Sequence, residues 1–228
     1  KVSQVKGIKR IRYTSPHPQD IDETLIKVMN KYPHICNHVH LPLQAGSDRI
    51  LKRMNRTYTK QEFLDLVIMI RNIIPNCGLS TDIIVGFPGE TDEEFNQTLE
   101  VVQKASFNSA FMFKYSPRPG TKASQYSDQV PEDIKQKRLE TLIEFQRDIT
   151  LQENQKNIGK TVDVLVEKES KKSSRQWAGR TEGNMWTIFD KKESSIKDVV
   201  KVKINSAHGV TMFGDIINSS ERKKNEAT

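Results

Sequence analysis

Four stretches in the first two thirds of the chain repeat one order: a β-rich run, a loop rich in Gly or Pro, and a helix-like run. The β-rich runs are Ile8–Tyr13, His38–Leu43, Leu79–Val85 and Ala110–Tyr115. Parallel strands need a crossover connection of this kind, whereas antiparallel strands can be joined by a short hairpin. The repeat therefore predicts parallel β/α units and restricts this region to the α/β class.

The loops that follow these runs bear on the kind of sheet. Four successive units with no sign of a reversal in strand order suit part of a β/α barrel better than a complete open sheet. Loops rich in Gly and Pro after the strands also suit a barrel, since barrel active sites are built from these loops. The loop Gly86–Thr91 leads into a helix N-terminus, which favours an anion. The loop Gln44–Asp48 offers an amide, a hydroxyl and a carboxylate. An ordinary turn explains each loop equally well on local evidence.

Capping signals mark the starts of the predicted helices. A cap residue followed three residues later by Glu occurs at Asp20–Glu23, Thr59–Glu62 and Thr91–Glu94. The apolar stripe of the first helix would consist of Ile21, Leu25, Val28 and Met29. A long helix is predicted after Pro131, to about Asn157, as a spacer between domains.

From Gly159 the pattern changes to short alternating strands. They are predicted at Thr161–Val166, Trp177–Thr181, Met185–Phe189, Val199–Ile204 and Val210–Ile217. Five short strands in so small a region indicate a closed β-barrel of the OB-like type. We therefore divide the chain into a domain of β/α units with its linker helix (1–155), a small β-barrel domain (156–219) and a disordered tail (220–228).

The net charge of +7 is unevenly distributed along the chain. Residues 1–155 hold 21 Lys and Arg against 19 Asp and Glu, whereas residues 156–228 hold 15 against 10. A basic domain of this kind favours a polyanion such as nucleic acid, because its cations neutralise phosphates. A basic surface that serves solubility alone is an equal alternative.

The composition argues against membrane insertion and a disulfide scaffold. No stretch approaches the ~20 apolar residues of a membrane span, and the first residues have no apolar core of a signal peptide. The two cysteines, Cys36 and Cys77, share no metal-ligand spacing, which suits a cytoplasmic protein. The chain starts at Lys1 and runs directly into strand-like sequence, so we expect further residues before it.

A His-x-His pair, His38 and His40, would place two imidazoles on one face of a strand. Such pairs bind metals in barrel hydrolases, but they need further ligands from other strands. The remaining candidates here are His17, Asp82 and Glu90, and no pattern gathers them. We therefore predict hydrogen-bonded histidines at the barrel mouth and no metal site.

Cations lie close to both tryptophans in the second domain. They are Lys168, Lys171, Lys172, Arg175 and Arg180, near Trp177 and Trp186. Cations interleaved with aromatic rings suit RNA, whose phosphates and unstacked bases they can contact. A solvated hairpin with its tryptophans in the core is the alternative.

Five motifs in fixed order carry a more specific signal than any one of them. They read RYTSPHP (12–18), HLPLQAGS (40–47), LKRMNRTYT (51–59), TDIIVGFPGET (81–91) and KYSPRPGT (114–121). Together they resemble the radical-SAM methylthiotransferases over nearly the whole chain. The SPHP motif resembles the branch that acts on dimethylallyladenosine in tRNA, and the last segment resembles the TRAM domain of that family.

The resemblance implies an N-terminal domain with one iron–sulfur cluster, an incomplete six-stranded β/α barrel, and an RNA-binding TRAM barrel. It also implies a second 4Fe-4S cluster on a CxxxCxxC loop, which reductively cleaves S-adenosylmethionine. The deoxyadenosyl radical then takes hydrogen from carbon 2 of the adenine next to the anticodon. Sulfur is inserted there, and a second S-adenosylmethionine supplies the methyl group. The implied partner is the anticodon stem-loop of tRNA, the sulfur donor stays open, and we expect a monomer.

In this mapping the chain holds the last four barrel strands and the TRAM domain. The implied S-adenosylmethionine contacts are Gln44, Ser47, Asp82, Ile84, Gly86, Glu90, Phe113 and Tyr115, with Phe113 and Tyr115 beside the adenine. Asp82 stands where the family motif usually has glycine. The expected RNA contacts are Lys168, Lys171, Lys172, Arg175, Arg180 and Arg118, although Arg118 could pair with a carboxylate instead of an RNA phosphate.

One departure from the family bears on activity. No CxxxCxxC occurs in the chain, and two isolated cysteines cannot hold a four-cysteine cluster. We therefore predict that this chain alone is inactive, contains no catalytic residue, and binds RNA weakly and S-adenosylmethionine poorly. The rival interpretations are a non-enzymatic RNA-binding module, a metal-dependent barrel hydrolase, and a sibling methylthiotransferase acting on another tRNA base or a ribosomal protein.

Overall fold

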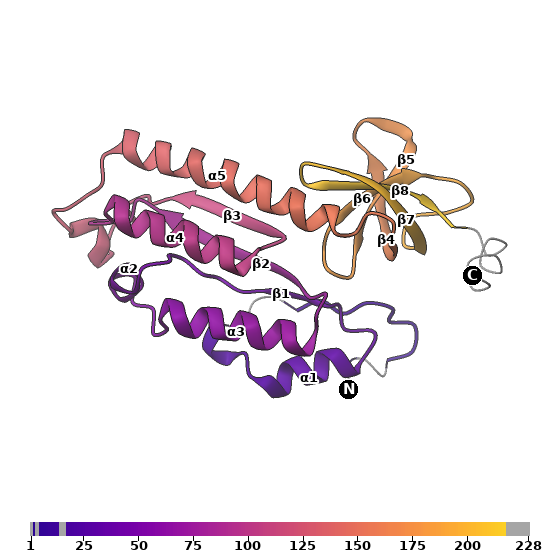
Figure 1. The fold of residues 1–228 in the computed structure, drawn as a ribbon, viewed down its shortest axis with the longest axis horizontal. Helices are drawn as coiled ribbons and strands as arrows, with labels where there is room; N and C mark the ends of the chain where they lie inside the picture. Colours follow the sequence, from indigo (N-terminus) through magenta and orange to yellow (C-terminus); the bar gives the residue numbers. More distant parts are fainter. Residues whose placement is uncertain (1, 3–4, 14–16, 218–228) are drawn as a thin grey trace. The chain divides into compact units, whose positions relative to one another are not determined.

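The computed structural model describes residues 2, 5–13 and 17–217. Residues Ser15 and Pro16 of the SPHP motif and the predicted tail 220–228 lie outside the described residues. The chain forms two compact units, Lys1–Ile149 and Thr150–Thr228, and the division falls inside one long helix (Figure 1).

The first unit contains a parallel sheet of three strands in the order β1-β2-β3. The strands are β1 (His38–His40), β2 (Gly78–Val85) and β3 (Ser109–Lys114). The helical segments are η2 (Pro18–Asp20), α1 (Glu23–Lys31), α2 (Asp48–Arg53), α3 (Lys60–Ile73), α4 (Asp92–Ala105), η3 (Lys122–Gln125) and α5 (Glu132–Gln155). Parallel strands alternating with helices confirm the predicted α/β class of this region.

The first predicted strand, Ile8–Tyr13, is wrong as an extended strand. Only Ile11 pairs, through a single parallel bridge with Ile35. The neighbouring backbone uses its groups locally, because Ile35 N–H donates to the carbonyl of Tyr32 and His38 N–H donates to that of Cys36. Strand pairing cannot extend from Ile11, because the backbone N–H groups next to Ile35 already donate to other carbonyls.

The first predicted helix cap is also wrong, whereas the other two are confirmed. Asp20 lies in η2, and the side chain of Asp22 instead caps α1 by accepting the N–H of Leu25. Val28 of the predicted stripe is 39% exposed, and Ile26 is buried in its place. The full capping boxes at Thr59 and Thr91 form as predicted and fix the starts of α3 and α4.

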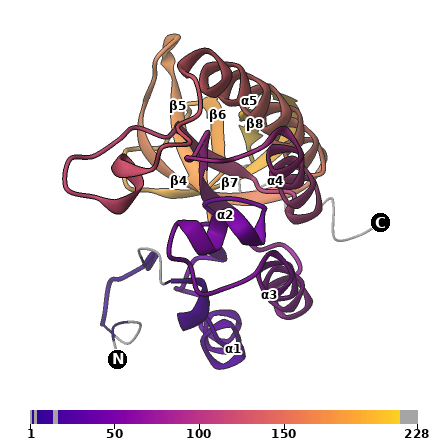
Figure 2. The same cartoon turned by 90° about the vertical axis from the view of Figure 1, so that its left-hand side faces the viewer.

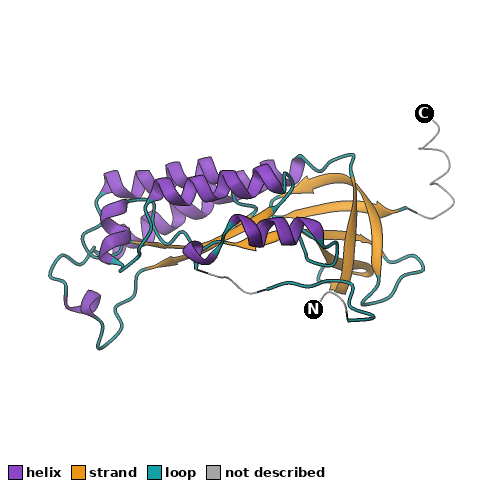
Figure 3. Cartoon of the chain, turned by 90° about the horizontal axis from the view of Figure 1, so that it is seen from below, coloured by secondary structure: helices purple, strands orange, loops and turns teal. Residues whose placement is uncertain are grey.

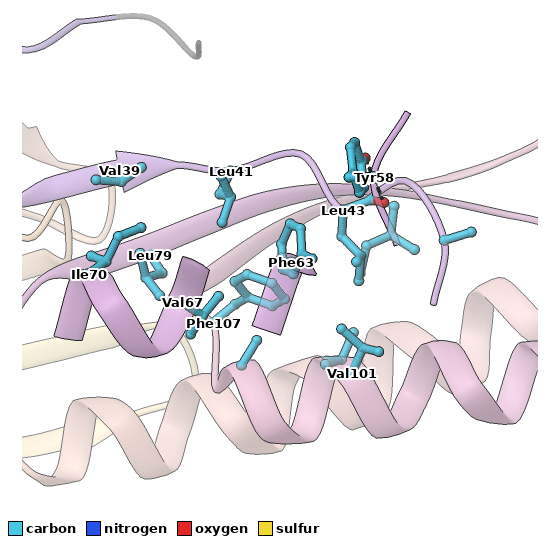
Figure 4. Close-up of a cluster of buried hydrophobic side chains, with 14 of the residues drawn as sticks. Val39, Leu41, Leu43, Tyr58, Phe63, Val67, Ile70, Leu79, Val101 and Phe107 are labelled. Carbon is cyan, nitrogen blue, oxygen red and sulfur yellow. Dashed lines mark hydrogen bonds between the residues drawn. The ribbon is translucent and has the colours of Figure 1, made fainter. Parts of the chain in front are cut away.

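The core of the first unit lies between the sheet and helices on one side of it. Helices α1, α3 and α4 follow one another along that side (Figure 2), and Figure 3 shows the same helices and strands coloured by secondary structure. Figure 4 shows strand side chains such as Val39 and Leu79 facing Phe63 and Val67 of α3 and Val101 of α4. Since strand residues alternate between faces, the residues between these apolar positions lie on the opposite face of the sheet.

The second unit is a closed barrel with the strand order β4-β5-β6-β8-β7. Its strands are β4 (Thr161–Ser170), β5 (Ser173–Thr181), β6 (Trp186–Asp190), β7 (Val199–His208) and β8 (Thr211–Ile216). All five predicted strands are present, and closure leaves no unpaired sheet edge. The buried core contains Val164, Val166, Phe189 and Met212, drawn from alternate strand positions. No helix among the described residues is long and apolar enough to cross a membrane.

Candidate functional site

The face of the three-stranded sheet opposite the helices is polar and aromatic; we call it the open face. Its residues are His38 and His40 on β1, Ser80, Asp82 and Ile84 on β2, and Phe111 and Phe113 on β3. The side chains of Phe111 and Phe113 are 58% and 53% exposed. Exposed aromatic rings on a sheet that also presents hydrogen-bonding groups are typical of a ligand surface.

A chain of hydrogen bonds crosses from β1 to β2 on the open face. Ser80 Oγ lies 2.9 Å from His38 Nε2 and 2.8 Å from His40 Nδ1. The other nitrogen of His40, Nε2, lies 3.2 Å from Asp82 Oδ2. The predicted hydrogen-bonded histidines are thus confirmed, and both rings are engaged by neighbouring polar groups.

The loop between β2 and α4 holds two predicted cofactor residues in the interior. Glu90 is buried, and its carboxylate accepts the N–H of Gly86 at 2.7 Å and Arg138 Nη1 at 2.8 Å. Burial raises the pKa of Glu90, and the Gly86 N–H and Arg138 oppose that rise. Gly86 has a φ of +70° and faces the side chain of Lys135. Glu90 and Gly86 therefore fix the conformation of the loop through contacts in the protein interior.

The loop after β1 is likewise built into the fold. Ser47 is buried, donates to Glu94 at 2.9 Å, and caps α2. Gln44 has a φ of +66°, and its backbone bonds both neighbours on β2, through Asp82 O and Ile84 N–H. A residue other than glycine rarely adopts this left-handed backbone conformation. Two backbone hydrogen bonds to β2 hold Gln44 in it, so the chain makes a constrained turn after β1.

The last predicted cofactor residue, Tyr115, lies beyond the carboxyl end of β3. Its ring packs edge-on against Phe87, with ring centroids 5.1 Å apart, and Lys135 Nζ lies 5.7 Å from its ring centroid. Its hydroxyl is buried with no hydrogen-bond partner in the described structure. Three of the predicted cofactor residues therefore lie together on the open face: Asp82, Ile84 and Phe113. Four others are buried inside the loops: Gln44, Ser47, Gly86 and Glu90.

The cations of the second unit divide into two groups. Lys168, Lys171, Lys172 and Arg175 are exposed on and beside the β4–β5 hairpin, whereas Arg180 forms an ion pair with Glu167 at 2.9 Å. Lys168 and Arg180 lie 4.6 and 5.0 Å from the ring centroid of Trp186. Trp177 belongs to the barrel core, which agrees with the core alternative for that ring. Arg118, in the first unit, is exposed in the loop after β3.

The described residues offer no ligands for an iron–sulfur cluster. They contain no group of three His, Cys, Asp or Glu side chains arranged to hold a metal. Cys36 and Cys77 are both buried and form no disulfide within the described structure, and burial raises the pKa of the Cys77 thiol to about 12. Since a cluster ligand is a thiolate, these two cysteines do not fit that role.

Sequence reasoning missed three residues that shape these sites. Arg138 on α5 binds Glu90 and Asp92, although that helix was predicted only as a spacer. Arg49 on α2 forms a two-bond pair with Glu94, at 2.7 and 2.6 Å. Phe111, one alternation before the predicted Phe113, could have been found from the same strand periodicity.

Two family models match the chain. Residues 2–102 match the radical SAM superfamily, and residues 155–217 match the TRAM domain. A solved structure, coproporphyrinogen III oxidase from Escherichia coli, described as a radical SAM enzyme, aligns with a TM-score of 0.51 over 74% of this chain and 45% of its own, at 14% identity. That likeness concerns the fold alone. The two units thus define a radical SAM α/β region followed by a TRAM barrel.

Curated relatives narrow the family further. The chain is 46% identical to the tRNA-2-methylthio-N(6)-dimethylallyladenosine synthase of Porphyromonas gingivalis over 91% of this chain and 45% of that protein. It is 45% identical to the enzyme of the same name from Acetivibrio thermocellus over 95% of this chain and 45% of that protein. The chain belongs to the radical SAM methylthiotransferase family and spans about half the length of the curated relatives it matches.

Proposed function

We propose that the chain is the tRNA-facing part of a radical SAM methylthiotransferase. In this proposal the whole protein adds a methylthio group to carbon 2 of dimethylallyladenosine beside the anticodon of cytoplasmic tRNA. The observation that carries the proposal is the pairing, in one chain, of radical SAM and TRAM sequence at 43–46% identity to relatives named for that reaction.

The carboxyl ends of the parallel strands are the proposed position of S-adenosylmethionine. Ile84 and Phe113 are neighbours in register, and their apolar side chains suit the adenine of the cofactor. Gln44, Ser47, Gly86 and Glu90 support this role from inside the loops, since their side chains or backbones fix the loop shape. Tyr115 extends the aromatic surface toward the strand ends.

The family also implies two 4Fe-4S clusters, of which the one on the CxxxCxxC loop would supply the electron that cleaves S-adenosylmethionine. We assign no ligand of either cluster to this chain, because two buried cysteines do not fit a four-thiolate site. We therefore propose that the ligands belong to residues outside these 228, and that the chain alone is catalytically inactive. We further propose that the protein acts as a monomer.

The TRAM barrel is proposed to bind the RNA backbone. Lys171, Lys172 and Arg175 are exposed around one hairpin, and Lys168 adds a cation over the half-buried Trp186. Such cations neutralise phosphates, and an aromatic ring nearby can stack on a base. Arg118 is proposed as a further phosphate contact from the first unit.

Nucleoside mass spectrometry of tRNA tests the proposed reaction. Deleting the gene that encodes this chain should remove the methylthio group from dimethylallyladenosine while leaving the dimethylallyl group in place. Restoring the complete gene should restore the modification. Unchanged methylthio content after deletion would reject the reaction and would favour a non-enzymatic RNA-binding module or a sibling enzyme with another target.

A further inference from the structure

We propose that Phe111, Asp82 and His40 on the open face form a recognition site for the adenine base of the RNA substrate. In this site Phe111 stacks on the ring, and Asp82 accepts a hydrogen bond from the amino nitrogen at position 6. His40 is a positioning residue for Asp82. The inference rests on the proposed function and deepens it, because it names the groups that would distinguish the target base.

Phe111 supplies a flat apolar surface that the fold does not use for its own core. It is 58% exposed and is a direct register neighbour of Asp82 on the adjacent strand. Its ring lies edge-on to His40, with the ring centroids 5.9 Å apart. Aromatic side chains on an open sheet face can stack on unpaired RNA bases.

Asp82 is held in a defined orientation by the chain of hydrogen bonds. With His40 Nε2 donating to Asp82 Oδ2, His40 Nδ1 is an acceptor and accepts a hydrogen bond from the hydroxyl group of Ser80. Ser80 Oγ in turn accepts from His38 Nε2. One arrangement of protons therefore satisfies all four groups and fixes the carboxylate on the sheet.

The number of available acceptor oxygens on Asp82 distinguishes adenine from guanine. Oδ2 is engaged by His40, while Oδ1 has no hydrogen-bond partner among the described residues, and the side chain is 32% exposed. One available carboxylate oxygen matches a single N–H donor, as on the Watson–Crick edge of adenine. Guanine presents two adjacent donors and would need both oxygens. An adenine substituted at its amino nitrogen still keeps one N–H.

The test measures base discrimination by the 228-residue chain at constant salt. The test uses two anticodon stem-loop RNAs that differ only at the nucleotide beside the anticodon. One carries adenine there, and the other carries purine, which lacks the amino group at position 6. We expect the unmodified chain to bind the adenine RNA about 10-fold more tightly, which corresponds to about 1.4 kcal/mol. Asp82→Asn should reduce the ratio to about 1, because His40 keeps the amide oxygen and leaves the NH₂ group facing the base.

The variants separate recognition from folding. Phe111→Ala should weaken binding of both RNAs about 5-fold or more and keep their ratio, whereas the equally exposed control Ile68→Ala should change neither. His40→Phe should lower the adenine-to-purine ratio, a readout that a merely structural role would not move. The matched control for Asp82→Asn is Asp148→Asn on an exposed helix face.

Three results would overturn the proposal: no measurable binding of either RNA, equal affinity of the unmodified chain for both, or the same ratio after Asp82→Asn. A parallel titration with S-adenosylmethionine identifies the source of the base. If Asp82→Asn and Phe111→Ala weaken only that ligand, the site holds the cofactor and the RNA assignment is wrong. Because this test measures binding alone, it can fail while the mass spectrometry succeeds, and the reverse also holds.

Discussion

The loop between β2 and α4 and the open face of the sheet are adjoining parts of one sequence motif, yet they use polar groups in opposite ways. In the loop, Glu90 is buried and paired with Arg138 and the Gly86 N–H. On the open face, Asp82 is ordered by His40 but keeps one oxygen exposed. Two acidic residues eight positions apart therefore lie in opposite environments, one buried and paired and the other partly exposed.

The difference follows from what each carboxylate would lose on exposure or burial. A buried carboxylate needs charged and hydrogen-bonding partners inside the protein, because it has given up its hydration. A partly exposed carboxylate keeps water as a partner and can exchange that water for a ligand. Substitutions in the loop should therefore change stability, and substitutions on the open face should change binding.

The largest expected effect is that of breaking the buried pair. Arg138→Met leaves Glu90 buried without its cation, and we expect a loss of about 3 kcal/mol in the free energy of unfolding. Urea titration followed by far-ultraviolet circular dichroism measures it. Arg147→Met, on the exposed side of the same helix, is the control. Equal losses in the free energy of unfolding for the two variants would show that the Arg138–Glu90 pair does not stabilise the fold more than an exposed arginine does.

The next effect is a pH dependence that originates at Glu94. Burial would raise its pKa, but hydrogen bonds from Arg49, Thr91 and Ser47 outweigh burial and lower it from 4.5 to about 2. Because the folded pKa lies below the unfolded value, the stabilisation is present above pH 4.5 and is lost as the pH falls toward 2. Arg49 is half exposed, so we expect a loss of roughly 2 kcal/mol.

Glu94→Gln should remove that loss from the stability profile between pH 5 and pH 2. Glu100→Gln, an exposed position on the same helix, should leave the profile unchanged. Denaturant titrations at several pH values measure both variants. A Glu94→Gln profile parallel to that of the unmodified chain would contradict the assignment.

The same contrast applies to the cations of the barrel, with a smaller expected effect. Replacing both Lys171 and Lys172 by Gln should reduce the magnitude of the negative slope of log affinity against log salt by about 1–2, since two proposed phosphate contacts are removed. Arg180→Gln should leave the slope nearly unchanged, because Glu167 already binds that guanidinium. RNA titrations at three or more salt concentrations measure the slope. A fall in slope with Arg180→Gln alone would reverse the assignment.

The smallest expected effect is on stability at the open face. Phe111→Ala should change the free energy of unfolding by less than about 0.5 kcal/mol, because the ring is mostly exposed. Phe107→Ala, which empties a fully buried position in the same unit, should cost about 3–5 kcal/mol. Thermal unfolding of both variants measures the contrast. A large loss for Phe111→Ala would mean that its ring supports the fold.

Local sequence patterns predicted the elements well where the chain itself supplies the signal. Thr59 and Thr91 form full capping boxes because the Glu three residues later is part of the same helix turn. The five barrel strands follow from alternation that is present in each segment. The strand at Ile8–Tyr13 failed because pairing depends on a partner, and the backbone near Ile35 is bonded elsewhere.

The parallel β/α class, the barrel that follows and the family could be predicted from the sequence, because periodicity, caps and motif order are all present in the linear chain. The burial and the contacts of each motif residue became apparent only in the folded protein. Glu90 can be buried because Arg138, 48 positions away in the sequence, donates a hydrogen bond to its carboxylate. Asp82 lies on the open face, where β1 and β3 place His40 and Phe111 beside it. Which groups bury and pair is a property of contacts between distant segments, and a linear pattern does not contain it.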